Sequence, residues 1–150
     1  MEFSFGINSF DEYWASTNRK VESFLADDLN EELAIECASK IWHLCDWYYE
    51  ENKAALKYKQ LSDLQGEVGN ACSSLRVMRD ICNGSKHGSL EKTRTPVIRK
   101  TQKHKGAFSS GFSQGFDVSV LEIQLTDGTE VCFIEAVQQA IEYWNCKLQP

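Results

Sequence analysis

The sequence predicts a mainly helical domain with a small antiparallel β-hairpin inserted before its last helix. Apolar residues recur at helical spacing in three long N-terminal segments and again in the final segment. Between them, residues 94–134 carry the glycine, serine and β-branched residues typical of strands and loops. We therefore expect a four-helix bundle with a β insertion at about 94–134, within one domain that spans residues 1–150.

The composition is that of a globular protein, with 42% hydrophobic and 25% charged residues. No apolar run approaches the roughly 20 residues that a membrane span requires. The first residues, MEFSFGINSFDEYW, lack the basic start and the apolar block of a secretory signal. We expect a cytoplasmic protein that does not interact with a membrane.

The first two helices have recognisable starts. The first is predicted over residues 9–26, with Ser9 as the N-cap and Glu12 in the position that completes a capping box. The second is predicted over about 29–52, after a similar capping pattern that begins at Asp28. Both segments carry apolar residues on one face, which predicts that they pack against a common core.

The third helix is predicted over about 61–83, because one apolar stripe runs through it. Asn83 and Gly84 are expected to end this helix, since both residue types tolerate the left-handed conformation of a helix C-terminus. A last helix follows the β insertion, with its core positions expected at Val137, Ala140, Ile141, Trp144 and Leu148.

The β insertion begins with a predicted strand at Thr95–Thr101, followed by the loop KGAFSSGFSQG. A second strand is predicted within Phe116–Leu125, and a third at Glu130–Ile134. The sequence TDGT between them predicts a tight hairpin turn, because Asp-Gly suits a two-residue loop.

The charge is concentrated unevenly. Residues 86–105 hold seven lysines and arginines against one glutamate, a net charge of +6, whereas the whole chain has −6, so the rest carries −12. A basic segment attracts phosphates, and it predicts RNA contacts at Lys100, Lys103 and Lys105. The following Phe108, Phe112 and Phe116 have the rings to stack on unpaired bases. Alternatively, the lysines protect a solvated edge strand or pair with acidic helices of the same chain.

The six cysteines are predicted to be free thiols. Cys37 and Cys45 are eight residues apart on one helical pattern, too far along the axis to form a disulfide, and Cys72 and Cys82 are ten apart. No CxxC pair or other clustered ligand set occurs. We therefore expect neither a metal nor a cofactor.

The end of the third helix concentrates polar groups. In a regular helix the side chains of Arg76, Arg79 and Asn83 share one face, and His87 continues that spacing if the backbone stays helical. An arginine can hold a phosphate with two hydrogen bonds, and a histidine moves protons near neutral pH. Such groups suffice for metal-independent RNA cleavage by attack of the RNA's own 2′-hydroxyl.

This arginine, the polar residue directly after it and the downstream histidine resemble the motif of the HEPN superfamily (higher eukaryotes and prokaryotes nucleotide-binding). Arg79 and Asp80 match its first half and His87 its histidine, although seven residues separate Arg79 from His87, a longer interval than the family's. The resemblance implies a helical bundle that acts as a dimeric, metal-independent endoribonuclease of a toxin-antitoxin or phage-defence system. It implies Arg79 and His87 as catalytic residues, with Asn83, Lys86 and Arg76 binding the RNA.

Two other interpretations stay open. In the first, Arg79 forms a surface ion pair, while Lys86 and His87 neutralise the negative end of the helix dipole. In the second, the chain is a non-catalytic adaptor or inhibitor that binds a protein partner, such as an antitoxin, through the aromatic second helix and the basic hairpin. That helix also offers a possible polar pocket, with its predicted residues at His43, Asp46 and Trp47.

Overall fold

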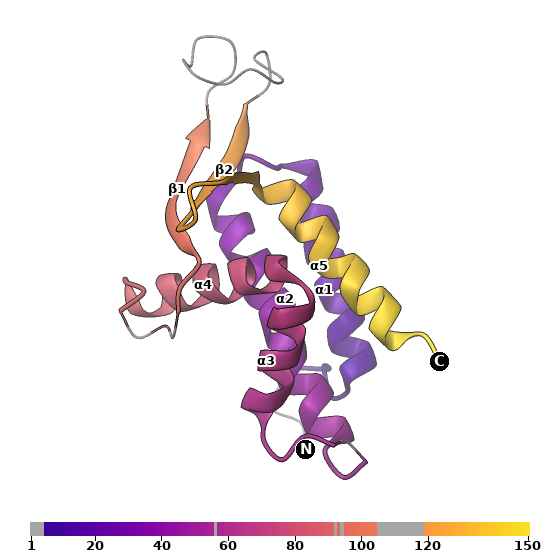
Figure 1. Ribbon diagram of the computed structural model, residues 1–150. Coiled ribbons are helices and arrows are strands. Elements are labelled where there is room, and N and C mark those ends of the chain that lie inside the picture. Colours follow the sequence, from indigo (N-terminus) through magenta and orange to yellow (C-terminus); the bar gives the residue numbers. More distant parts are fainter. Residues whose placement is uncertain (1–4, 56, 92, 94, 105–118) are drawn as a thin grey trace.

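The computed structural model describes residues 5–55, 57–91, 93, 95–104 and 119–150. The mainly helical class is confirmed, and the described part of the chain forms helices and one antiparallel sheet (Figure 1). The helices are α1 (Phe10–Ala26), α2 (Glu31–Asn52), α3 (Leu61–Ala71), α4 (Ser73–His87) and α5 (Phe133–Leu148). The strands are β1 (Ile98–His104), β2 (Val120–Leu125) and β3 (Glu130–Cys132). None of the described helices is long and apolar enough to cross a lipid bilayer.

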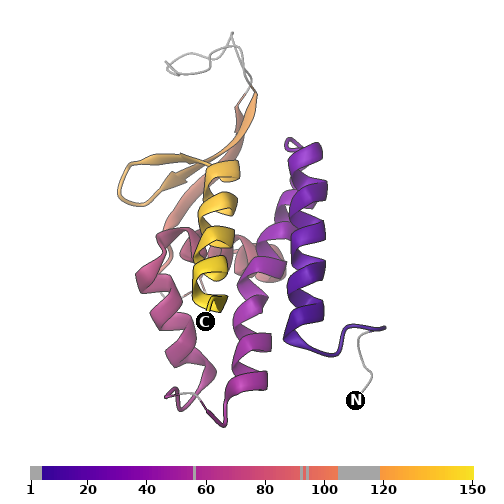
Figure 2. The ribbon, with the colours of Figure 1, turned by 90° about the vertical axis from the view of Figure 1, so that its right-hand side faces the viewer.

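Helices α1 and α2 lie side by side, with α5 beside them (Figure 2). The predicted cap of α1 is confirmed, because the Ser9 hydroxyl accepts a hydrogen bond from the Glu12 amide at 3.2 Å. The predicted start of α2 was wrong by a few residues. Asn30 caps it instead of Asp28, and its side chain accepts the Leu33 amide at 3.0 Å.

The predicted third helix is two helices. Cys72 adopts an extended conformation (φ −141°, ψ 103°), so the chain turns between α3 and α4. The break leaves no backbone group of Cys72 unpaired, because its amide donates to Val68 and its carbonyl accepts from Leu75. In Figure 1, α4 lies crosswise to α2 and α3. The described part of the chain therefore has five helices where four were expected.

The predicted end of this segment at Asn83-Gly84 was also wrong, since α4 continues to His87. Gly88 ends the helix in the left-handed conformation (φ +70°), and its amide donates to the Gly84 carbonyl at 2.8 Å. Gly84 itself is helical, which shows that Asn-Gly permits a helix end without requiring one.

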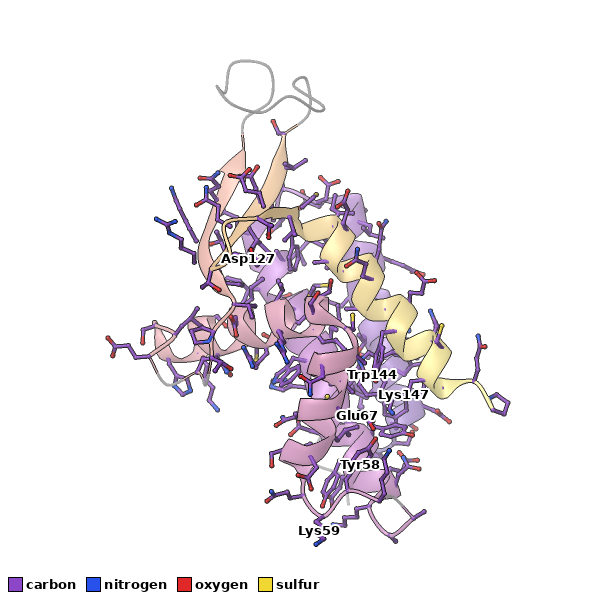
Figure 3. The ribbon with its side chains drawn as sticks, viewed as in Figure 1. Tyr58, Lys59, Glu67, Asp127, Trp144 and Lys147 are labelled. Carbon is purple, nitrogen blue, oxygen red and sulfur yellow. The ribbon has the colours of Figure 1, made fainter. Side chains whose placement is uncertain are left out.

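The sheet has the order β1-β2-β3 and is antiparallel throughout. The predicted turn is confirmed at Asp127-Gly128, where Gly128 has φ +90° and the Leu125 amide donates to the Thr129 carbonyl at 2.8 Å (Asp127 is labelled in Figure 3). The strands differ from prediction at their ends: β1 is shifted towards the C-terminus, β3 ends where α5 begins, and residues 116–118 lie outside the described chain.

The core lies between the helices and the inner face of the sheet. Phe24 of α1 packs edge-on against Phe133 at the start of α5, with ring centroids 5.2 Å apart. The largest fully buried side chains come from the helices and from β2: Trp144, Phe24, Phe133, Ile41, Leu44, Leu64, Leu75, Met78 and Ile123. Three of the five positions predicted for the last helix, Val137, Ala140 and Trp144, are completely buried.

Glu67 fixes α3 to its neighbours (Figure 3). Its carboxylate accepts a hydrogen bond from the Tyr58 hydroxyl and pairs with Lys57 at 3.1 Å and with Lys147 of α5 at 3.4 Å. The hydrogen bond from Tyr58, followed by those charges, lowers the pKa of Glu67. These contacts hold α3 in place beside α4, where the two helices form the walls of a cavity.

Candidate functional site

Arg76, Arg79 and Asn83 of α4 line one cavity of about 480 Å³, together with residues from α2, α3 and the segment that precedes β1. We call it the arginine cavity. Its other lining residues are mostly polar or small: Trp42, Ser62, Gln65, Gly66, Gly69, Thr93 and Thr95. The structure thus brings together three of the residues predicted to bind phosphate.

Gly69 allows α3 to approach α4 closely at this cavity. A Cβ atom at residue 69 would lie 3.3 Å from the side chain of Arg76, tighter than most real contacts. The guanidinium of Arg76 therefore lies against α3, where its Nη2 donates a hydrogen bond to the Asn70 side-chain oxygen. Asn70 is neutral, so this contact orients Arg76 without compensating its charge.

Arg79 is held by an acidic neighbour. Its Nε and Nη2 donate to Asp80 Oδ1 at 2.9 and 2.8 Å, and Nη2 also donates to the Thr95 carbonyl at 3.0 Å. Its Nη1 has no hydrogen-bond partner among the described residues. Arg79 is therefore an ion-paired arginine with one nitrogen left to meet a ligand.

Asp80 has a role that the sequence did not indicate. The residue is 1% exposed, and its Oδ2 accepts the backbone amides of Val97 and Ile98 at 2.6 and 3.0 Å. One carboxylate thus joins α4 to the start of β1 and holds Arg79 at the edge of the cavity. The Arg79–Asp80 pair is partly buried, unlike the surface ion pair considered from the sequence.

Asn83 lies one helical turn beyond Arg79, and its side-chain amide donates to the Thr93 hydroxyl at 3.2 Å. This hydrogen bond draws the segment after α4 back over the helix, where Thr93 is buried and closes one side of the cavity. Asn83 therefore shapes the cavity that it lines.

His87 and Lys86 lie at the exposed last turn of α4. The backbone does stay helical through Gly84, so His87 follows Asn83 by one turn. His87 is not among the residues that line the arginine cavity, and eight residues of helix place it about 12 Å along the axis from Arg79. Within one chain, the structure does not bring the two predicted catalytic residues around a common cavity.

The lysines of β1 that were predicted to contact RNA lie on different faces of the strand. Lys103 pairs with Glu31 of α2 at 3.2 Å, so part of the basic charge neutralises an acidic helix of the same chain. Lys100 is exposed, and the odd spacing between Lys100 and Lys103 places them on opposite faces of the strand. Lys105 and the phenylalanines at 108, 112 and 116 lie outside the described residues.

The three residues predicted for a pocket on α2 do not all line the same cavity. Trp47 stacks on Tyr13 of α1, with ring centroids 5.1 Å apart, and lines a second cavity of about 400 Å³ together with Asp46. His43 instead contacts Cys82 of α4, with 3.5 Å between Nε2 and Sγ. His43 therefore faces a cysteine rather than Arg79 or His87.

All six cysteines belong to the described residues, and none is paired with another. In the same part of the chain, no three histidine, cysteine or acidic side chains are grouped so that they could hold a metal ion. Glu122 is a further residue that the sequence did not single out. Its Oε1 accepts from Gln102 at 2.7 Å, whereas its buried Oε2 has no hydrogen-bond partner in the part of the chain that the structure describes.

Comparisons with protein-family models, with curated proteins and with solved structures find no match to this chain.

Proposed function

We propose that the protein is an RNA-directed effector of the HEPN-like kind, and that the arginine cavity receives a phosphate group of the RNA. The observation that carries this proposal is the shared cavity itself. Arg76, Arg79 and Asn83 line it from one helix, together with the hydroxyl-bearing residues Ser62 and Thr93. Guanidinium, amide and hydroxyl groups are the donors that proteins use to hold phosphate oxygens.

Arg76 has the main binding role in this proposal. Its hydrogen-bond partner Asn70 is neutral, so its positive charge is available to an anion. Arg79 shares its charge with Asp80 and contributes its fixed position at the cavity. Residues 86–105 carry a net charge of +6 and include Thr93 and Thr95 of the cavity wall, so they attract phosphate towards the cavity and make binding sensitive to salt.

Cleavage is the second part of the proposal. The RNA 2′-hydroxyl would lose its proton and attack the phosphorus, and the departing 5′-oxygen would take up a proton. His87 would serve one of these transfers and Arg79 would stabilise the charge on the phosphate. Because His87 lies outside the cavity wall of its own chain, we propose that a homodimer or a bound RNA strand brings it to the reacting phosphate.

The HEPN-like four-helix bundle, with the α3–α4 pair counted as one helix, belongs to the same proposal. So do the cytoplasmic setting, the toxin-antitoxin or phage-defence role and a protein antitoxin as partner. The adaptor interpretation has less support, because the aromatic side chains it needs pack within the fold. Trp42 is buried, and Tyr48 contacts Trp144 with ring centroids 5.6 Å apart.

The binding test uses fluorescently labelled single-stranded RNA and compares Arg76→Ala with Arg19→Ala by anisotropy. Arg19 is an exposed arginine on α1, so its removal changes the net charge equally at a place away from the cavity. We expect Arg76→Ala to weaken binding about tenfold, which corresponds to about 1.4 kcal/mol, and Arg19→Ala to weaken it by less than about twofold. Equal effects of the two variants, or no binding by the wild type even at low salt, would contradict the proposal.

A further inference from the structure

Cys82 lies at a contact between α4 and α2 that the proposed function does not use. Its Sγ is 3.5 Å from Nε2 of His43, and the residue is 6% exposed, whereas His43 is an exposed residue. A cysteine and a histidine at this distance can share a proton, because the imidazole takes up the proton that the thiol gives away.

The groups around Cys82 come from three helices. On α2, Ser39 and His43 hydrogen-bond to the sulfur, and Asp46 lies one turn from His43. On α4 itself, Lys86 lies one turn further along, and from α1 the Tyr13 ring adds a phenol whose pKa is raised by burial. Two cationic side chains and a hydroxyl donor therefore surround one sulfur atom.

This environment favours the thiolate. Burial opposes ionisation of Cys82, but the hydrogen bond and charge of His43, with smaller contributions from Ser39 and Lys86, outweigh burial, so the pKa of Cys82 lies below its usual value. The hydrogen bond to Cys82 likewise raises the pKa of His43 above its usual value, despite partial burial. The two shifts are opposite in direction, as expected for a thiolate next to an imidazolium.

Two other buried cysteines of the same molecule have the opposite pKa shift from Cys82. Cys37 and Cys45 are completely buried in the core. Burial raises the pKa of Cys37 to about 12, and burial also raises the pKa of Cys45. Neither is a nucleophile at neutral pH, so the His43 contact distinguishes Cys82 from thiols that only fill the core.

We propose that Cys82, activated by His43, is a modification site that reacts with hydrogen peroxide or a small hydroperoxide to form a sulfenic acid. The thiolate sulfur attacks one peroxide oxygen, the S–O bond forms and the O–O bond breaks. The sulfur is oxidised by two electrons and the peroxide is reduced. The departing hydroxide, or the alkoxide from a hydroperoxide, takes the proton of the His43 imidazolium and leaves as water or as the alcohol, so the histidine ends neutral. A peroxide is the oxidant class small enough for a sulfur that is mostly covered.

The test is a brief exposure of the folded, reduced chain to limiting hydrogen peroxide at pH 6.5, with a dimedone-type reagent present to trap sulfenic acids. Mass spectrometry then measures the labelled fraction of each of the six cysteines. We expect about tenfold more label on Cys82 than on the exposed Cys146, because His43 gives the Cys82 sulfur a cationic hydrogen-bond partner. Greater labelling of Cys146 or no labelling of Cys82 would overturn the proposal.

The histidine variants test the cause. We expect His43→Ala to reduce the labelling of Cys82 to the level of Cys146 or below, while His87→Ala, which removes an exposed histidine at the end of α4, leaves it unchanged. His43→Gln keeps a polar side chain of similar size and provides a folded comparison, with circular dichroism as the check on folding. Undiminished labelling of Cys82 in a folded His43 variant would refute the role of His43.

Discussion

Asp80 and Arg79 form a partly buried ion pair at 2.8 Å, in which the aspartate side chain is fully covered and the arginine side chain is 18% exposed. The second oxygen of the same carboxylate accepts the backbone amides of Val97 and Ile98. A single side chain therefore fixes the arginine at the cavity and the beginning of β1 to α4. Removing it leaves a partly buried charge and two backbone amides without their partner.

Substitution Asp80→Ala should lower the free energy of unfolding by about 3 kcal/mol or more, since one variant breaks a buried pair and leaves several donors unsatisfied. Urea unfolding followed by circular dichroism measures the change. Asp63→Ala is the matched control, because Asp63 is an exposed aspartate that accepts one backbone amide, that of Lys59 at 3.2 Å. We expect Asp63→Ala to lower the free energy of unfolding by less than about 1 kcal/mol. Equal losses of unfolding free energy in the two variants would show that Asp80 stabilises the fold no more than an exposed aspartate does.

The two glycines near the end of α4 should respond in opposite directions to alanine. Gly88 has φ +70°, so Gly88→Ala should destabilise the protein by about 1 kcal/mol. Gly84 is helical and its Cβ would meet only the Leu90 side chain at 3.6 Å, so Gly84→Ala should stabilise it by about 0.5–1 kcal/mol. Thermal unfolding of the two variants measures both signs. If Gly84→Ala destabilised the protein and Gly88→Ala did not, the helix would end at Gly84 instead.

The hairpin turn should show a depressed carboxyl pKa. Hydrogen bonds from the Thr129 hydroxyl and amide, at 2.6 and 2.9 Å, lower the pKa of Asp127. Its contribution to stability is therefore present above the unfolded pKa of about 3.9 and is lost as the pH falls through the folded value. Carboxyl NMR titration should give a higher pKa for Asp127 in Thr129→Val and no change in Thr126→Val. An unchanged value in Thr129→Val would contradict the hydroxyl contact.

If the cleavage part of the proposed function is correct, His87→Ala should reduce RNA cleavage by about a hundredfold, the usual contribution of an acid-base group. The exposed position of His87 predicts a change in unfolding free energy of less than about 0.5 kcal/mol. Cleavage of labelled RNA in EDTA is measured for wild type, His87→Ala and the control Arg19→Ala, which removes an exposed charge away from the cavity. Equal cleavage by wild type and His87→Ala would exclude His87 from the chemistry without affecting the binding proposal.

Local signals in the sequence predicted the features that depend on a few adjacent residues. The Ser9 cap and the Asp127-Gly128 turn occur as expected, because the side chains and backbone that form them are close neighbours in the chain. The apolar stripe of the third helix did not reveal the break at Cys72. Leu64 and Val68 before it and Leu75 after it are all fully buried, so one stripe serves two helices.

The candidate site depends on contacts that no local pattern reveals. Asp80 meets amides 17 and 18 residues away, and His43 meets a cysteine 39 residues away. Spacing alone predicted that Arg76, Arg79 and Asn83 share one helical face. The part of the cavity wall that α3 forms was not predictable, because it depends on the turn at Cys72. Asp80 is the only acidic residue of α4, and this was the one available signal for it.

The most direct test of phosphate binding at the arginine cavity is an NMR titration that follows the arginine Nε–Hε signals as a short single-stranded RNA is added at low salt. We expect the largest shifts at Arg76 and at the side-chain amide of Asn83, a smaller shift at Arg79 because Asp80 already holds its Nε, and none at the exposed Arg19. Shifts that spare Arg76 and Asn83 while RNA binds would place the interface elsewhere and contradict the account.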